Sequence, residues 1–187
     1  MRLVTDAERE LRFRALAEFV IEPVRRYLAR RIDAATADEV LNETLLVCWR
    51  RLDDVPTADE AVPWSIAVAR NLLANAQRAE RRRGRLVGKI IALDPPTSVV
   101  EIEPTEGDDV AVRDALTRLR RDDAELLRLW AWEHLESPQL ATVLGISANA
   151  AAIRLHRAKT RLKAELLKSA PSAGHVEVEE GNTDARR

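Results

Sequence analysis

The chain of 187 residues has a single cysteine, Cys48, and no apolar run near the roughly 20 residues that a membrane-spanning helix needs. One cysteine excludes a disulfide within the chain and a cysteine-rich zinc cluster. The first residues, MRLVTDAERE, also lack the apolar core of a secretory signal. These absences predict a soluble, cytoplasmic protein with no membrane insertion.

Motifs for catalysis and for cofactor binding are absent as well. The histidines, His134, His156 and His175, do not combine with Cys48 in a metal-ligand spacing. The sequence has no glycine-rich phosphate loop and no serine or cysteine nucleophile in a motif context. We therefore expect no enzymatic activity, no metal site and no cofactor.

Glycine and proline are also scarce, at 6 and 8 residues, and they cluster outside the periodic segments. Those segments are rich in Ala, Leu, Arg and Glu, which favours helices throughout the chain. The 30 basic and 31 acidic residues nearly cancel, but they are arranged in blocks of opposite sign. The blocks are therefore more informative than the net charge.

One stretch, 137–167, predicts a helix-turn-helix unit followed by a long basic helix. Ser137 is a candidate N-cap with Pro138 at the first helical position, and the first helix stops at Gly145. Ser147 then caps the second helix. A short helix, a glycine-containing turn and a second helix form the layout of a DNA-reading helix pair.

The second helix of this pair divides into two sides. Residues at steps of four, three and four form a buried stripe: Ala151, Leu155, Ala158 and Leu162. Other residues point away from it: Ala148, Asn149, Ala152, Ile153 and His156. Six Lys or Arg stand against one acid between residues 150 and 168, which suits a helix that faces phosphates. Asn149 could pair with an adenine edge or with a phosphate.

Three further helices are predicted in the first half of the chain. The first covers about 6–31, with Pro23 breaking or kinking it and one apolar side: Leu16, Phe19, Val20, Val24, Tyr27 and Leu28. The second begins near residue 36 or 37 and ends near 52. After a loop at 53–62, Pro63 opens a third helix with a basic C-terminal half.

The charge pattern inverts between residues 94 and 109, where six acids and no base occur with three prolines. We interpret residues 91–109 as an acidic flexible linker between two small helical domains, 7–90 and 110–168. A helix from 110 to about 119 and another from 122 to about 135 precede the helix-turn-helix. Trp130 and Trp132 point to different sides of the helix at 122–135, and we expect one of them in the core and the other at a protein interface. The tail, 169–187, is predicted to be disordered. The predicted fold class is all-α.

The order of these segments resembles an extracytoplasmic-function (ECF) sigma factor of bacterial RNA polymerase, over residues 13–167. Residues 37–49, ADEVLNETLLVCW, resemble region 2.2, and residues 63–83, PWSIAVARNLLANAQRAERRR, resemble regions 2.3 and 2.4. Residues 115–159 resemble region 4. The resemblance implies a protein that binds core RNA polymerase and directs promoter-specific transcription initiation. It would bind double-stranded promoter DNA and the unwound non-template strand, and an anti-sigma factor would regulate it.

The resemblance also implies three sets of contact residues. The polymerase-binding set is Asp38, Glu39, Asn42, Glu43 and Leu46. The set for the minus-10 element is Trp64, Arg70, Asn71, Asn75, Arg78, Arg81, Arg82 and Arg83. The set for the minus-35 element is Gln139, Thr142, Ala148, Asn149, Ala152, Ile153, Arg154, His156, Arg157 and Lys159. Trp64 is expected to be a core residue that shapes a pocket for an unstacked base, rather than a platform on which the base stacks.

Some residues depart from the family pattern. Three alanines, 150–152, replace the usual Thr-Val-Lys, and His134 replaces a frequent glycine. Two other functions remain open: a stand-alone helix-turn-helix regulator, which would bind a palindrome as a dimer, and a helical adaptor that binds polymerase without reading DNA. Two roles fit the acidic linker equally well. It could lie in the RNA-exit path of the polymerase, where its negative charge would replace that of RNA, or it could be a spacer that makes no contacts.

Overall fold

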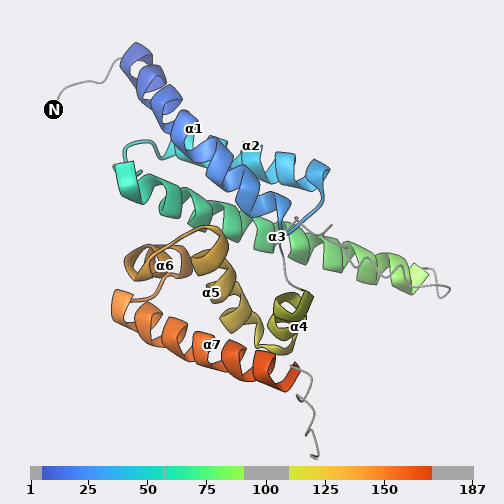
Figure 1. The fold of residues 1–187 in the computed structure, drawn as a ribbon. Helices are drawn as coiled ribbons and strands as arrows, with labels where there is room; N and C mark the ends of the chain where they lie inside the picture. The colour runs from blue at the N-terminus through green and yellow to red at the C-terminus, as the bar shows by residue number, and fades with distance from the viewer. Residues whose placement is uncertain (1–5, 57, 91–109, 170–187) are drawn as a thin grey trace, which may run out of the picture.

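A computed structural model describes residues 6–56, 58–90 and 110–169, except for the side chains of residues 58, 83–90 and 169. This part of the chain holds α-helices, one 3₁₀ turn and no strand, which confirms the all-α prediction (Figure 1). The elements are α1 (Asp6–Ala29), α2 (Ala34–Arg50), η1 (Ala58–Glu60), α3 (Ala61–Ile90), α4 (Val110–Arg118), α5 (Arg121–Trp132), α6 (Ser137–Leu144) and α7 (Ala148–Ser169). None of these helices is apolar over a length that would cross a membrane.

Helices α1, α2 and α3 form the first group, in which each contacts the other two. The C-terminal half of α1 supplies the core residues Val20, Val24 and Leu28, all with no exposed surface. Phe19 was expected beside them but is 71% exposed. It lies one step of 100° away from Val20, which takes the core position in its place.

Two predicted helix boundaries of this group need correction. Helix α1 continues through Pro23 and ends at Ala29, two residues before the predicted end, so of the two effects expected of Pro23 the break does not occur. Helix α2 begins at Ala34, earlier than expected, because the carboxylate of Asp33 accepts a hydrogen bond from the Thr36 amide at 3.0 Å. The same bond lowers the pKa of Asp33.

Helices α4 to α7 form the second group, and α7 packs against α4, α5 and α6. Gly145 ends α6 with a φ of 65°, a left-handed conformation that suits glycine. Ser147 caps α7 as predicted, since its hydroxyl accepts a hydrogen bond from the Ala150 amide at 3.2 Å. The predicted stripe of α7 is buried at Ala151, Leu155 and Ala158, whereas Leu162 at its C-terminal end is half-buried.

The predicted start of α6 was wrong by one residue. Glu136 is the N-cap, and its side chain forms a capping box with Gln139, so Ser137 is the first helical residue. The Glu136 amide donates to the side-chain oxygen of Gln139 at 3.0 Å, and the Glu136 carbonyl accepts from the Leu140 amide at 2.8 Å. His134, just before this turn, has a φ of 54°, which explains why glycine is common there in the family.

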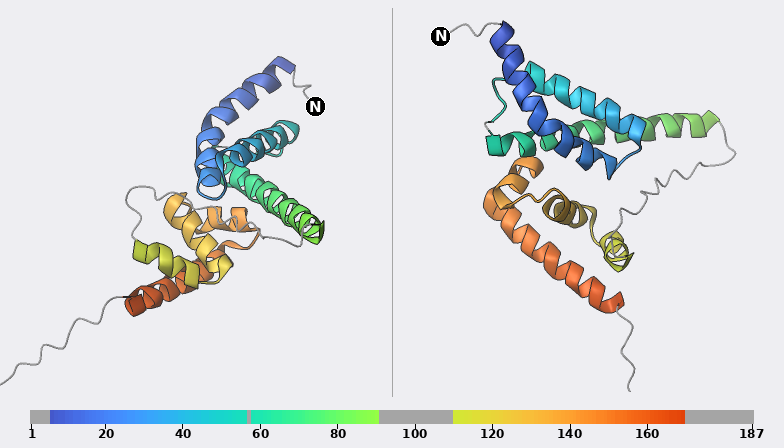
Figure 2. Two further views of the ribbon diagram at one scale, coloured as in Figure 1. Left: turned by 90° about the vertical axis from the view of Figure 1, so that its right-hand side faces the viewer. Right: turned by 45° about the horizontal axis from the view of Figure 1, so that its top comes forward.

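The two groups of helices pack on one another. Helix α6 lies against α3, and the C-terminal end of α1 meets α5 (Figure 2). Their buried apolar residues form one continuous cluster that includes Val24 and Leu73 from the first group and Leu129 and Leu140 from the second. The sequence did not predict this contact. The predicted linker and the tail beyond residue 169 lie outside the described residues.

Candidate nucleic-acid interface

A row of polar side chains follows one face of α3. Asn71, Asn75, Arg78 and Arg82 are exposed and recur at steps of four, three and four, so they share one side of the helix. Asn75 accepts a hydrogen bond from the Arg78 guanidinium at 2.5 Å. Half-buried Trp64 lies seven residues before Asn71 and therefore begins the same row. We call these five residues the α3 row.

The remaining predicted minus-10 residues lie in different places. Arg81 is exposed at the edge of the α3 row. Arg70 is half-buried and so is less accessible than the residues of the α3 row that follow Trp64. The side chain of Arg83 lies outside the described residues. Trp64 has a cation–π partner, because the Arg51 guanidinium lies 5.6 Å from its ring centroid. The other residues of the α3 row are exposed and can contact a ligand.

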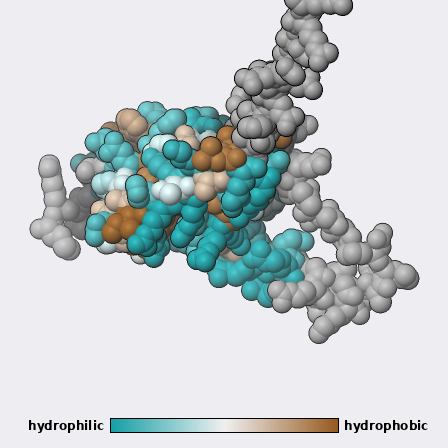
Figure 3. All heavy atoms as spheres, turned by 60° about the horizontal axis from the view of Figure 1, so that its bottom comes forward, coloured by the Kyte–Doolittle hydropathy of each residue, from teal (hydrophilic) through white to brown (hydrophobic). Residues whose placement is uncertain are grey.

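Helix α7 presents the second predicted reading face. Ala148, Asn149, Ala152, Ile153 and His156 are all exposed, opposite the buried stripe of the helix. Ile153 is 44% exposed, so its side chain is accessible to a ligand. Figure 3 shows the underside of the molecule as a mainly hydrophilic surface with small, separate hydrophobic patches. We call these five residues the α7 face.

Cations flank the α7 face on both sides. Arg154 and Arg157 are exposed on one flank and Lys159 is exposed on the other. The Lys159 ammonium lies 3.5 Å from the ring centroid of Trp130, which is 40% exposed. Trp130 thus supports a predicted phosphate-binding side chain, a role that the sequence analysis missed. The Trp–Ala–Trp spacing was a signal for it, since it placed one of the two rings outside the core.

Two predicted minus-35 residues on α6 are engaged within the chain. Gln139 accepts a hydrogen bond from the Glu136 amide at 3.0 Å, as part of the capping box. The Thr142 hydroxyl donates to a carboxylate oxygen of Glu60, in the first helical group, at 3.3 Å. Their predicted phosphate contacts would require these bonds to be exchanged.

Helix α2 carries a third exposed surface. The predicted polymerase-binding residues are all exposed and recur at steps of one, three, one and three: Asp38, Glu39, Asn42, Glu43 and Leu46. Leu46 is 51% exposed. We call these five residues the α2 stripe. Its combination of carboxylates, an amide and a leucine suits a protein partner with basic and apolar groups.

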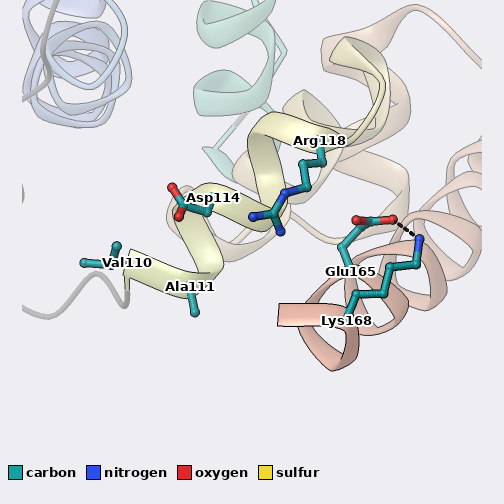
Figure 4. A pocket seen from close by; sticks show the side chains of 6 residues that line it. All are labelled: Val110, Ala111, Asp114, Arg118, Glu165 and Lys168. Atoms are coloured by element: carbon teal, nitrogen blue, oxygen red, sulfur yellow. Dashed lines mark hydrogen bonds and ion pairs between the residues drawn. The ribbon is translucent and has the colours of Figure 1, made fainter. Parts of the chain in front are cut away.

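Other features of the described residues offer no reactive centre. No group of three possible metal ligands occurs among them. Burial raises the pKa of the Cys48 thiol, which lies 3.8 Å from the Ser65 hydroxyl in the core. An open pocket between α4 and α7 is lined by both apolar and charged side chains, and its Lys168 and Glu165 pair at 2.7 Å (Figure 4). It lies apart from the α3 row and the α7 face.

Comparison with known proteins gives a consistent result. The model of region 4 of the sigma-70 family matches residues 109–162. ECF RNA polymerase sigma factor SigL of Mycobacterium tuberculosis is 30% identical over 135 residues, which cover 72% of this chain and 76% of that protein. Probable RNA polymerase sigma factor RfaY of Xanthomonas campestris is 31% identical over 145 residues; the match covers 75% of this chain and 36% of that longer relative.

Two solved structures share the fold. CnrH, in complex with the cytosolic domain of CnrY, aligns with a TM-score of 0.54 at 21% identity, over 88% of this chain and 100% of that chain. The sigma factor RpoE, in complex with the anti-sigma factor NepR from Bartonella quintana, aligns with a TM-score of 0.51 at 23% identity, over 88% and 97% of the two chains.

Proposed function

The chain belongs to the ECF RNA polymerase sigma factors, which direct promoter-specific transcription initiation, and from this premise we propose which of its surfaces carry out each step. The α2 stripe binds core RNA polymerase. The α3 row reads the minus-10 element, and the α7 face reads the minus-35 element. The observation that supports this division is the separate exposure of all three surfaces on different helices.

The α3 row fits an unwound strand. An unstacked base needs an aromatic or apolar wall and an amide that reads its edge, and Trp64, Asn71 and Asn75 supply such groups in succession. Arg78 and Arg82 continue along the same side of the helix, where they can follow the phosphates of the same strand. The non-template strand of the minus-10 element is the ligand that this order of groups favours.

The α7 face fits an intact major groove. Its alanines allow the helix backbone to approach the groove floor closely, while Asn149 and His156 can hydrogen-bond to base edges and Ile153 can contact a thymine methyl. Arg154, Arg157 and Lys159 lie on the flanks, where they can contact the phosphates on either side of the groove. Sequence reading by this helix therefore rests on few side chains.

An anti-sigma factor is the expected regulator. The similar RpoE was solved with the anti-sigma factor NepR, and by analogy this chain is proposed to have a partner of that kind. The proposed activity takes place in the cytoplasm, where polymerase and chromosome are. It assigns no catalytic residue to the chain, since sigma factors position the polymerase and the polymerase carries out the chemistry.

Transcription in vitro tests the assignment. Core RNA polymerase with the protein and a library of promoter sequences is expected to initiate at a subset that shares two spaced elements. Core polymerase alone is the control. A stand-alone helix-turn-helix regulator would instead bind a palindrome without polymerase, and an adaptor would bind polymerase with no selection from the library. Either result would overturn the proposal.

The role of the α2 stripe has its own test. Glu43→Lys reverses a charge on the stripe and is expected to weaken binding to core polymerase at least tenfold. Glu18→Lys makes the same change at an exposed position of α1, outside all three surfaces, and should leave binding unchanged. Equal loss in both variants would show that net charge rather than the α2 stripe determines binding.

A further inference from the structure

The N-terminal half of α1 contacts a short turn that follows α2. We propose that Arg9, Arg12 and Phe13 of this half are positioning residues for minus-10 reading, because they fix the turn that carries a partner of Trp64. We call these three residues the α1 clasp and residues 51–54 the α2 turn. The inference rests on the proposed function, namely on the assignment of the α3 row to the minus-10 element.

The hydrophobic core does not account for the N-terminal half of α1. All buried residues of the helix lie in its C-terminal half, from Val20 onwards. Leu11 is 70% exposed and Phe19 is 71% exposed. Residues 6–19 are nevertheless helical, and they lie on the side of the molecule where α2 leads into α3 (Figure 1). Because a short helix without packing is only marginally stable in water, the contacts of this half with the α2 turn are important for its position.

Two arginines of the α1 clasp bind backbone carbonyl groups at and just after the end of α2. The Arg9 guanidinium donates to the Trp49 carbonyl at 2.7 Å, and the Arg12 guanidinium donates to the Leu52 carbonyl at 3.4 Å. The last carbonyls of a helix lack donors within the helix and carry partial negative charge, so cationic donors suit them. Both arginines also pair with the Asp53 carboxylate, Arg12 at 2.9 Å and Arg9 at 3.7 Å.

An aromatic contact gives the α1 clasp a preferred direction. The Phe13 ring meets the Trp49 ring edge-on, with centroids 5.3 Å apart and an interplanar angle of 77°. The Arg9 guanidinium lies 5.1 Å from the centroid of the same indole. Edge-on aromatic pairs and cations over an indole both have preferred geometries. A sliding movement of α1 along α2 would therefore break both contacts with Trp49.

The α2 turn connects the α1 clasp to Trp64. Leu52 anchors the turn, since it is only 3% exposed, and the Asp54 amide donates to the Arg51 carbonyl at 2.8 Å. The Nε atom of Arg51 donates to the Asp54 carboxylate at 3.0 Å, and the guanidinium lies 5.6 Å from the Trp64 ring centroid. Asp53, which the clasp holds, is the residue next to Asp54. The position of Arg51 over Trp64 thus depends on where the clasp holds the turn.

The ion pairs of the α1 clasp are better suited to positioning than to stabilisation. The side chains of Arg12 and Asp53 are 48% and 70% exposed, and ion pairs with such exposure contribute little to the free energy of folding. Several directional contacts from one helix nevertheless restrict where the turn can lie. A site that is held in its productive geometry before the ligand arrives selects its ligand better. We therefore expect the clasp to affect the selection of minus-10 bases more than it affects the fold.

Charge reversal and charge exchange test the proposal. Holoenzyme is formed from core polymerase and the full chain, and its affinity is measured for a single-stranded oligonucleotide with the minus-10 sequence selected in the promoter library. The same measurement on every single-base variant gives the preference at each position. Arg12→Glu should reduce this preference at least threefold at one position or more. Arg12→Glu/Asp53→Arg restores an ion pair and should return the preference to within twofold of the parent. Arg14→Glu is the matched control, since Arg14 pairs with Glu10 inside α1, and it should change nothing.

A second comparison leaves the charge of the protein unchanged. Phe13→Leu keeps an apolar side chain but removes the ring that contacts Trp49, and it should lower the same preference at least twofold. Phe19→Leu makes the same change at an exposed position outside the α1 clasp and should have no effect. Circular dichroism shows that each variant is folded. The preference for minus-35 bases in duplex DNA and the affinity for core polymerase should stay unchanged in all variants.

The outcomes separate this inference from the proposed function. If the parent holoenzyme shows no preference among the minus-10 oligonucleotides, the assignment of the α3 row is at fault. If the parent discriminates, and folded Arg12→Glu and Phe13→Leu proteins discriminate equally well, the α1 clasp has no positioning role. Equal loss of preference for both promoter elements would show that the clasp only stabilises the fold. If the exchanged pair recovers no preference, the ion pair does not position the turn, and this result also overturns the inference.

Discussion

The α3 row and the α7 face are both polar surfaces on basic helices, but they are built in opposite ways. In α3 an indole, two amides and two guanidinium groups follow one another along a single side of the helix. In α7 the central side chains are two alanines, an isoleucine, an asparagine and a histidine, and the Arg and Lys side chains are on the flanks. The same charge on two helices therefore predicts different ligands once its position around the helix is known.

The difference agrees with the physical state of the two DNA elements. A single strand exposes base faces and phosphates along one path, which a linear row of mixed groups can follow. A duplex presents base edges in the centre of the groove and phosphates at its rims, which a small central face with flanking cations can match. The comparison thus predicts that residues of the α3 row contact bases and phosphates along the same path. On α7 the central residues should contact bases only, and the flanking cations should contact phosphates only.

The largest effect is expected from the cations in and beside the α3 row. Arg78→Ala/Arg81→Ala should weaken open-complex formation by about 2–3 kcal/mol, or roughly 30- to 140-fold, because two charge-assisted phosphate contacts are lost. Promoter opening can be followed by permanganate footprinting. Binding to core polymerase should change little, since the α2 stripe is untouched.

The control for this variant is Arg25→Ala/Arg26→Ala, which removes two exposed cations from α1. It should leave promoter opening nearly intact. Similar losses of promoter opening in both double variants would show that the α3 cations act only through the net charge of the protein. The proposed difference between the α3 row and the α7 face would then be wrong.

The sequence predicted the local features of both helices. Periodicity was sufficient for α7, because its buried stripe of Ala151, Leu155 and Ala158 leaves only one side for a ligand. Gly145 and Ser147 marked the turn correctly, since their conformational roles depend on a few neighbouring residues. The residues of the α2 stripe came from the family resemblance instead, and all of them are exposed.

Features that depend on distant residues were not predicted. Glu133 and Arg31 are separated by 102 positions, and nothing in a helical pattern indicates that they are paired. The N-cap of α6 was assigned to Ser137 because the competing bond of Glu136 becomes visible only in the folded backbone. Phe19 was expected in the core because an apolar residue is assumed to be buried, although single exposed ones are common.

A smaller effect is expected from the one amide at the start of the α7 face. Asn149→Ala should change the preference for one minus-35 base by about 1–3 kcal/mol, because a bidentate contact to a base edge is lost. Binding to a panel of promoters that differ at single minus-35 positions measures this change. A uniform loss over the whole panel would show that Asn149 contacts a phosphate, and α7 would then have mixed contacts as α3 does.

The start of α7 offers a test that does not depend on base contacts. Ser147→Ala removes the hydroxyl that accepts the Ala150 amide and should lower the free energy of unfolding by about 1 kcal/mol. Thermal unfolding followed by circular dichroism measures the change. Ser137→Ala is the matched control at the start of α6, where Glu136 is the N-cap, and it should have a smaller effect.

The smallest effect is expected from adding a cation to the α7 face. Ala152→Lys restores the charge that the family usually has near this position, on the exposed side of the helix. If the face admits one more phosphate contact, the slope of log affinity against log salt concentration should steepen by about 0.9, with less than roughly a tenfold gain in affinity. Ala164→Lys, exposed near the C-terminal end of α7, is the control and should leave the slope unchanged. If the slope steepens only in Ala164→Lys, the DNA contacts the C-terminal half of α7. The α7 face would then not be the surface that reads the groove.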